Sequence, residues 1–196
     1  MGVQRRRPMK DASWLQPWIE EIYERAAGNY VLELGCGEGL DSSILSAQGL
    51  EFISIDIDFE SLTNCSQIQG CQPINADLSS KLPFPDNAFN FVLASLSLHY
   101  FSWKNTLEIV YEIRRVLTPE GMILIRVNST KDINFGAGVG EEIEKNYYLN
   151  SERKKRFFDK TAVETVLAGM NIRSLLHETI DRYGKDKQVW VACAEA

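Results

Sequence analysis

The sequence contains few of the residues that build metal centres and disulfide frameworks. It has two histidines and four cysteines among 196 residues, no two cysteines form a C-x-x-C pair, and none has a histidine nearby. This pattern argues against a zinc site and is typical of reduced thiols in an intracellular protein. We therefore expect no metal centre.

Long apolar runs are also missing. No stretch approaches the roughly 20 residues that a membrane-spanning helix needs, and the chain does not open with a signal-peptide pattern. Gly2 does not begin a myristoylation site, because Arg6 stands where that site needs Ser or Thr. We predict a cytoplasmic protein with no membrane partner.

An excess of positive charge is the third absence. The formal net charge is −6, whereas a general nucleic-acid binder normally carries a basic field. Two basic clusters, RRR at residues 5–7 and RKKR at residues 153–156, are interpreted as a solvated tail and a surface face. A nucleic-acid substrate is disfavoured.

The chain does contain apolar, β-branched runs that alternate with helical ones. Expected strands cover residues 30–35, 52–57, 72–76, 89–96 and 122–128. Expected helices between them cover residues 40–49, 59–67 and 103–117. Strands that are apolar throughout and alternate with helices predict a parallel sheet covered on both faces. The fold class is therefore α/β, a Rossmann-like three-layer sandwich.

The end of the chain predicts an antiparallel addition to this sheet. A helix is expected to open with a capping box of Thr161 and Glu164. The runs 172–180 and 188–196 are expected to pair around the turn at 181–187, which gives a mostly parallel seven-stranded sheet ending in an antiparallel β-hairpin.

One domain is expected over residues 1–196, a length suited to a single well-buried core. Within it, residues 1–28 form a tail and a helix, with a polar, mobile first dozen residues and an amphipathic helix over residues 13–26. Residues 129–160 are expected to form an extension of this domain.

The most informative segment is VLELGCGEGLDSSIL, residues 31–45, where three glycines follow the first strand. In a doubly wound sheet the ligand lies beyond the carboxyl ends of the strands. Asp56 ends the second strand, 21 residues after Gly35, and is placed to accept hydrogen bonds from ribose hydroxyls. This spacing suits a dinucleotide or another nucleoside ligand.

The charges around the glycines disfavour a pyrophosphate. The third glycine comes one residue earlier than in G-x-G-x-x-G, and Glu33, Glu38 and Asp41 crowd the expected phosphate position. At about 4 Å and an effective dielectric of about 20, each like-charge contact costs roughly 4 kcal/mol. These acids favour a nucleoside with a cationic tail, a description that fits S-adenosylmethionine.

Three segments carry a family resemblance: VLELGCGEG, ISIDID and NADLSSKLPFPDNAFNFVLASLSLHY. Together they resemble the class I S-adenosylmethionine-dependent methyltransferases, and within them the small bacterial methyltransferase-11 type, over about residues 28–128. Asn90 departs from the family, where an acid is usual at a position that tends to be structural. The resemblance implies S-adenosylmethionine as cofactor and methyl transfer as activity, and it implies that the extension over residues 129–160 lies on the substrate side.

The resemblance also implies which residues hold the cofactor. Glu33 orients the methionine end, Asp56 takes the ribose hydroxyls and Asp77 accepts from the adenine amine. Glycine-loop backbone passes close to the ligand, and two apolar side chains lie beside the adenine. Two residues after the fourth strand face the methionine portion or the transferring methyl. The full expected set is Glu33, Gly35, Cys36, Gly37, Gly39, Asp56, Ile57, Asp77, Leu78, Ala94 and Ser95. Cys36 is interpreted as a small side chain, not a nucleophile.

Methyl transfer from a sulfonium is an in-line displacement, so a general base is needed only if the acceptor must lose a proton. His99 and Tyr100, just past the fourth strand, are the nearest catalytic candidates. A packed His99 is the alternative. His177 lies in a predicted strand away from these loops and is interpreted as structural.

Tyr147, Tyr148 and Arg156, in the extension, are the candidate substrate-binding residues. They either close on a planar or anionic acceptor or belong to a helix that packs its aromatic side on the sheet. Trp14 and Trp18 either form a lid over the cofactor or pack in the N-terminal helix.

The end of the fourth strand has neither the N/D-P-P-Y/F motif of exocyclic-amine methyltransferases nor the Pro-Cys pair that attacks cytosine. A small-molecule acceptor is therefore expected. A nicotinamide-dependent oxidoreductase and a non-catalytic S-adenosylmethionine-binding module remain as alternative functions.

Overall fold

The computed structural model describes residues 9–10, 13–26 and 28–196. Its main sheet has the strand order β1-β10-β11-β6-β5-β2-β3-β4. The strands are β1 (Met9–Lys10), β2 (Val31–Leu34), β3 (Phe52–Asp56), β4 (Cys71–Asn75), β5 (Phe89–Ser95), β6 (Leu117–Asn128), β10 (Asn171–Arg182) and β11 (Lys185–Glu195). Apart from Met9 and Lys10, the first dozen residues, expected to be mobile, lie outside the described residues.

The predicted seven-stranded sheet is confirmed, and the two-residue β1 adds a short edge strand to it. Strands β2 to β6 run parallel, and β11 joins β6 and β10 in antiparallel pairs. The chain builds outward in one direction from β2 to β3 and β4, and in the other from β2 to β5 and β6. The strand order therefore reverses at the carboxyl end of β2, where the glycine loop begins.

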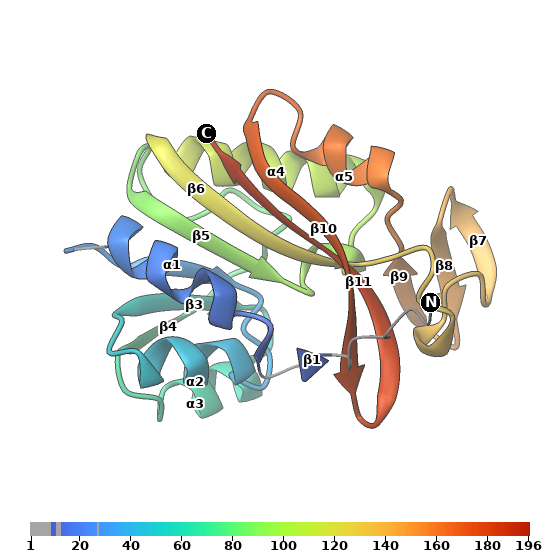
Figure 1. Cartoon of the computed structure of the whole chain (residues 1–196), viewed down its shortest axis with the longest axis horizontal. Coiled ribbons are helices and arrows are strands. Elements are labelled where there is room, and N and C mark those ends of the chain that lie inside the picture. The colour runs from blue at the N-terminus through green and yellow to red at the C-terminus, as the bar shows by residue number, and fades with distance from the viewer. Residues whose placement is uncertain (1–8, 11–12, 27) are drawn as a thin grey trace, which may run out of the picture.

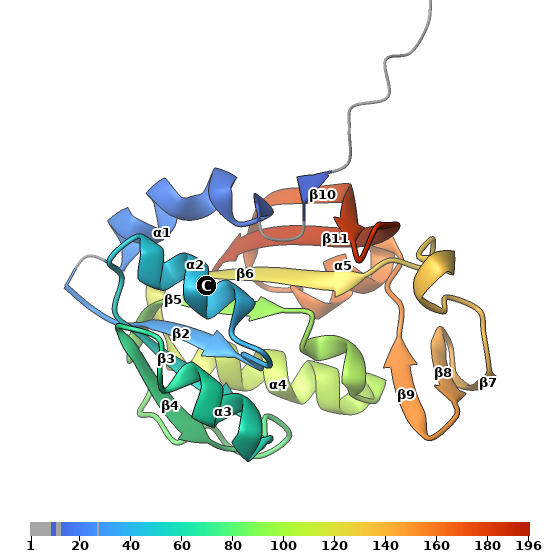
Figure 2. The same ribbon diagram turned by 90° about the horizontal axis from the view of Figure 1, so that it is seen from below.

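Helices cover both faces of this sheet, as Figures 1 and 2 show. Apolar side chains of α1 and α2 pack in a core on one face, and those of α4 and α5 pack in a core on the other. The helices are η2 (Gln16–Trp18), α1 (Ile19–Arg25), α2 (Leu40–Ala47), α3 (Phe59–Cys65), η3 (Leu98–Tyr100), α4 (Trp103–Val116), η4 (Ile133–Phe135) and α5 (Lys160–Val166). No helix in the described part of the chain is both long and apolar enough to cross a bilayer.

Several element boundaries differ from the prediction, and the helix expected over residues 13–26 is the short η2 followed by α1 over Ile19–Arg25. The capping box was placed at Thr161, but the N-cap of α5 is Asp159, whose side chain accepts a hydrogen bond from the Ala162 N–H at 2.8 Å. Aspartate at 159 satisfies a free amide one half-turn earlier, so the helix starts before Thr161. Helix α4 ends at Val116, and β6 begins immediately at Leu117, five residues before the strand was predicted to begin.

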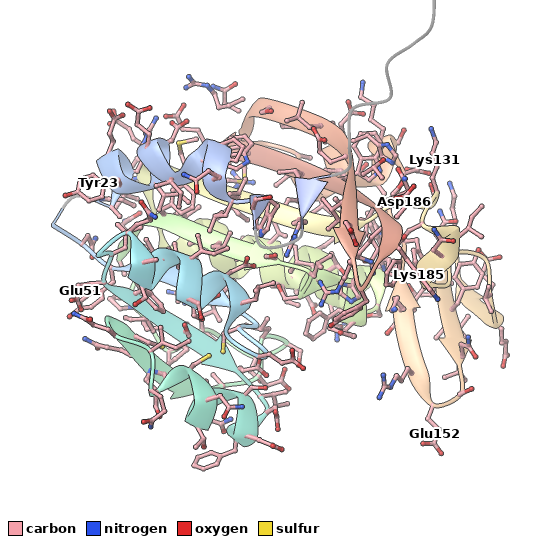
Figure 3. All side chains as sticks on the ribbon, turned by 60° about the horizontal axis from the view of Figure 1, so that its bottom comes forward. Tyr23, Glu51, Lys131, Glu152, Lys185 and Asp186 are labelled. Atoms are coloured by element: carbon pink, nitrogen blue, oxygen red, sulfur yellow. The ribbon has the colours of Figure 1, made fainter. Side chains whose placement is uncertain are left out.

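Residues 141–156 form a separate three-stranded antiparallel sheet instead of the helix that was one alternative. Its strands are β7 (Glu141–Glu144), β8 (Tyr147–Asn150) and β9 (Arg153–Arg156). The turn between β8 and β9 places Ser151 and Glu152 at φ of 49° and 72°, the left-handed conformation of a tight hairpin. Figure 3 shows Glu152 at the outer tip of this sheet, away from the main body.

Candidate active site

A cavity of about 940 Å³ opens beyond the carboxyl ends of β2, β3 and β5. This is the edge at which the strand order reverses, so the topology places loops from several strands around one space. The predicted cofactor-binding residues that line it are Gly35, Cys36, Gly37, Gly39, Asp56, Ile57, Asp77, Leu78 and Ser95. Glu33 and Ala94 belong to the same predicted set, but they lie outside the lining.

The glycine loop is pressed against the loop that follows β5. Gly35 has a φ of +74°, and a Cβ at this position would stand 2.5 Å from the Cβ of Ser97. Any side chain would therefore push the two loops apart, in addition to the strain of a left-handed backbone. Glycine is required here for close approach, and the result is exposed loop backbone along the cavity wall.

Asp56 links the end of β3 to the glycine loop. One of its carboxylate oxygens accepts from the Gly37 N–H at 2.8 Å, and the other accepts from the Asp58 N–H at 2.9 Å. Each carboxylate oxygen has a second lone pair, so these two bonds leave capacity to accept from a ligand diol. Asp77 accepts from the Ser79 N–H at 2.8 Å and lines the cavity from the loop after β4.

Glu33 lies beneath the loop and is 3% exposed. Its carboxyl group accepts from the Ser42 hydroxyl at 2.6 Å and from the Ser54 hydroxyl at 2.5 Å. Burial raises the pKa of Glu33 to about 7, because the charged form loses its hydration. Its contacts join β2, α2 and β3 to each other. Ala94 is also fully buried, in the core on the α4 face.

The Cys36 thiol is hydrogen-bonded to the Cys65 thiol at the end of α3, and this bond and burial together raise the pKa of Cys36. A nucleophilic cysteine requires the opposite shift, since the thiolate is the reactive form. The environment of Cys36 thus agrees with its interpretation as a small side chain.

His99 and Tyr100 lie side by side on η3, with ring centroids 4.1 Å apart. Tyr100 is exposed and lines the cavity, whereas His99 is 4% exposed and stands behind the lining. Burial lowers the pKa of His99 well below its usual value, and repulsion from Lys187, Lys155 and Arg182 lowers it further. The imidazole is therefore neutral at physiological pH.

The three candidate substrate-binding residues lie on β8 and β9, outside the lining of this cavity. Tyr147 donates its hydroxyl to the Tyr100 carbonyl at 2.8 Å. Arg156 is buried, forms an ion pair with Glu144 and stacks over the Tyr147 ring at 4.6 Å. The Tyr147 hydrogen bond joins the small sheet to η3, and the Arg156 contacts stabilise the small sheet itself.

Arg156 also lines a second cavity of about 460 Å³, together with residues of α4 and α5. Tyr148 is half-buried and packs on Phe157, with centroids 6.1 Å apart. The structure therefore brings Tyr147 to the loop that carries Tyr100, but it does not bring Tyr148 or Arg156 to the first cavity.

A buried polar group at the cavity floor was missed by sequence reasoning. The Trp14 indole donates to Asp41 at 2.7 Å, and the Arg126 guanidinium lies 3.6 Å from Asp41 and 4.2 Å from the Trp14 ring centroid. Arg126 also donates to the Ser95 hydroxyl at 2.9 Å. The sequence signal that could have revealed this group is the arginine inside the apolar run MILIRVN, because a charge there must be buried with a partner. Trp14 thus packs under the cavity and is absent from its lining.

Two other positions agree with structural interpretations. The His177 Nε2 and the Ser129 hydroxyl lie 2.7 Å apart, and the His177 ring contacts Trp190 edge-on. Asn90 accepts from the Thr118 hydroxyl at 3.1 Å between β5 and β6. Arg182 and Tyr183 reach the cavity from the distant β10–β11 hairpin, and no sequence pattern predicted this.

Comparison with known proteins finds similarity to methyltransferases in both sequence and fold. Residues 32–125 match the methyltransferase-11 family, described as a methyltransferase domain. YqeM of Bacillus subtilis, which is named as a methyltransferase, is 33% identical over 118 residues, or 58% of this chain and 47% of YqeM. The chain spans about half the length of this curated relative.

Solved structures share the fold. A Methanosarcina mazei S-adenosylmethionine-dependent methyltransferase aligns with a TM-score of 0.74 at 18% identity, over 85% of this chain and 91% of its own. The Burkholderia thailandensis 1,6-didemethyltoxoflavin N1-methyltransferase, solved with its substrate and S-adenosylhomocysteine, aligns with a TM-score of 0.70 at 19% identity, over 94% and 79%. Residues 32–125 are therefore similar to the methyltransferase-11 family, and the chain shares the fold of solved S-adenosylmethionine-dependent methyltransferases.

Proposed function

We propose that this protein binds S-adenosylmethionine in the 940 Å³ cavity and transfers its methyl group to a small-molecule acceptor. One observation carries the proposal. Asp56 and Asp77 lie at the ends of the neighbouring strands β3 and β4, and they line the same cavity as the backbone of the glycine loop. Carboxylates at these positions suit a nucleoside and disfavour a pyrophosphate.

The residues present fit this cofactor. Asp56 would hold the ribose hydroxyls and Asp77 the adenine amine, while Ile57 and Leu78 would cover the adenine faces. The backbone of the glycine loop and the nearby Asp41 would face the cationic amino-acid tail. Glu33 would act indirectly, by fixing α2 and the loop through its serine contacts. When bound, S-adenosylmethionine supplies a methyl group already activated on a sulfonium.

The chain would contribute to catalysis mainly by alignment. Holding acceptor and methyl donor in line can supply about 7–11 kcal/mol of the barrier reduction. Ser95 and Tyr100 line the cavity where the methyl group would point, and the neutral His99 stands behind Tyr100. An acceptor N–H or O–H group that takes up the methyl would release its proton to water or to a nearby base.

A small-molecule acceptor is supported by the volume of the cavity and by the didemethyltoxoflavin methyltransferase among the structural neighbours. The negative net charge continues to disfavour nucleic acid. A cytoplasmic location stays a prediction from composition and cysteine usage.

Calorimetric titration of Asp56→Ala with S-adenosylhomocysteine tests the proposal. Removing a charged acceptor from the ribose hydroxyls should weaken binding by about 1.5–3 kcal/mol. Asp86→Ala is the matched control, because Asp86 is exposed and pairs with Arg115, away from the cavity lining. Equal affinities in the two variants contradict the ribose assignment. Tight NAD(P) binding with no S-adenosylhomocysteine binding would favour the oxidoreductase instead.

A further inference from the structure

The cavity lining carries basic side chains in addition to the acids at the strand ends. They are Arg126 on β6 and Arg182 at the end of β10. Arg126 is 2% exposed, so its charge is held inside the protein rather than in solvent. Guanidinium groups match carboxylates in shape and charge, because each presents a planar fork of N–H donors.

Strand register places further polar side chains on the same face of the sheet. On β6, Asn128 follows Arg126 by two residues and pairs with Val189 of β11. Lys187 precedes Val189 by two residues on β11. Lys187 pairs with Ile180, two residues before Arg182. Paired residues of antiparallel strands share a face, as do residues two apart. We call these four residues the basic end: Arg126 and Arg182 line the cavity, and Asn128 and Lys187 lie on the same face of the sheet outside the lining.

The electrostatic potential at the neighbouring His99 is positive. Lys187 and Arg182, with Lys155 of β9, all lower the pKa of His99. Lys187 is paired with the buried Asp132 at 2.7 Å, and Arg126 lies 3.6 Å from Asp41. Lys155 donates to the Phe135 carbonyl at 3.3 Å.

Buried polar atoms beside these charges have no hydrogen-bond partner within the described residues. They are the Ser97 hydroxyl, the His99 Nδ1 and both polar atoms of the Asn128 amide. Ser97 lines the cavity, and Asn128 is 1% exposed. A buried polar group without a partner costs about 1–3 kcal/mol, so the Ser97 hydroxyl in the cavity lining favours a polar guest.

We propose that the basic end binds a carboxylate of the methyl acceptor, with Arg182 and Arg126, the two guanidinium groups that line the cavity, as its ligands. This inference rests on the proposed function, since it names the substrate class of the same site. An anchored carboxylate would fix the acceptor at the end of the cavity that Ser95 and Tyr100 also line.

Ligand-detected NMR with the S-adenosylhomocysteine-loaded protein tests this with benzoate and its neutral isostere benzamide. We expect benzoate to bind at least tenfold more tightly than benzamide. Arg182→Gln should weaken benzoate about tenfold and leave benzamide unchanged. Arg173→Gln is the matched control, because Arg173 lies at the other end of the same strand, half exposed and paired with Glu195. Equal binding of benzoate and benzamide, or equal effects of the two variants, would overturn the proposal.

Two further readouts separate the outcomes. If S-adenosylhomocysteine does not bind the unmodified protein, the proposed function fails; if it binds but benzoate shows no preference, only the carboxylate inference fails. Weaker S-adenosylhomocysteine binding by Arg182→Gln would assign Arg182 to the cofactor's own carboxylate and overturn the inference. Preference for phenyl phosphate with no binding of benzoate would also overturn it, by identifying a phosphoryl site.

Discussion

The two ends of the cavity are built in different ways. The nucleoside end comes from consecutive strand ends within residues 33–97 and consists of carboxylates and exposed loop backbone. The basic end comes from β6, β10 and β11, whose side chains meet only because the terminal hairpin pairs with β6. A local motif specifies the first end and long-range pairing assembles the second, so the two should respond differently to substitution.

The largest expected effect is at the basic end. Lys187→Ala leaves the Asp132 carboxylate buried without its cation, and the free energy of unfolding should fall by about 3–5 kcal/mol. Urea denaturation measures this loss. Lys160→Ala provides the control: its pair with Glu164 is exposed and should be worth no more than about 0.5 kcal/mol. Similar losses in both variants would show that Lys187 is not held as a buried partner of Asp132.

The next effect is a pH dependence at the nucleoside end. The pKa of Glu33 is about 7 in the folded protein and near 4.5 when exposed. Between these values the folded state keeps a proton that the unfolded state has released, so this group lowers stability as pH rises through the window. Glu33→Gln abolishes that dependence and should gain up to about 3 kcal/mol relative to the unmodified protein between pH 4.5 and 8.

Denaturation curves at several pH values test this. Glu38→Gln is the comparison, because Glu38 is on the same loop and exposed. Its stability difference from the unmodified protein should stay nearly flat over the same range. A flat difference for Glu33→Gln as well would mean that the Glu33 carboxyl is not protonated in the folded protein.

The smallest effect concerns the contact that joins the two ends. Trp14 donates to Asp41 and stacks on Arg126, so Trp14→Phe should remove a hydrogen bond to a charged group at a cost of about 1.5 kcal/mol. Trp18→Phe is the control, since its half-buried ring packs on the same apolar core. Thermal or urea unfolding compares the two. A larger loss from Trp18→Phe would place the importance in ring packing instead.

How far the sequence predicts this molecule follows the same division. The parallel strands and the loop acids are encoded by local runs and spacings, and nearly all of the predicted cofactor residues line one cavity. The two exceptions, Glu33 and Ala94, are both buried in strands. Glu33 stands in an apolar run, and the sequence could not show that its carboxyl group bonds to Ser42 and Ser54 beneath the loop.

The small sheet and the basic end were harder to predict. Strands β7 and β9 read EEIE and RKKR, without the apolar alternation that identifies a strand. Arg182 and Tyr183 gain their position from pairing with a strand more than fifty residues earlier, through β11, and spacing carries no information about that. Strand pairing, not the local sequence pattern, determines the structure of both regions.

The hairpin that supplies Arg182 and Tyr183 has a consequence for divergence. Its strands are held along their whole length by the β10–β11 ladder, and the turn itself is only Tyr183 and Gly184, with φ of 55° and 72°. Figure 3 shows the adjoining Lys185 and Asp186 at this projecting end. Under the proposed function, a substitution at this turn would change the part of the cavity lining that contacts the acceptor and would leave the strand ends of the nucleoside end in place. The choice of acceptor would then be adjustable at the tip of one hairpin, separately from cofactor binding.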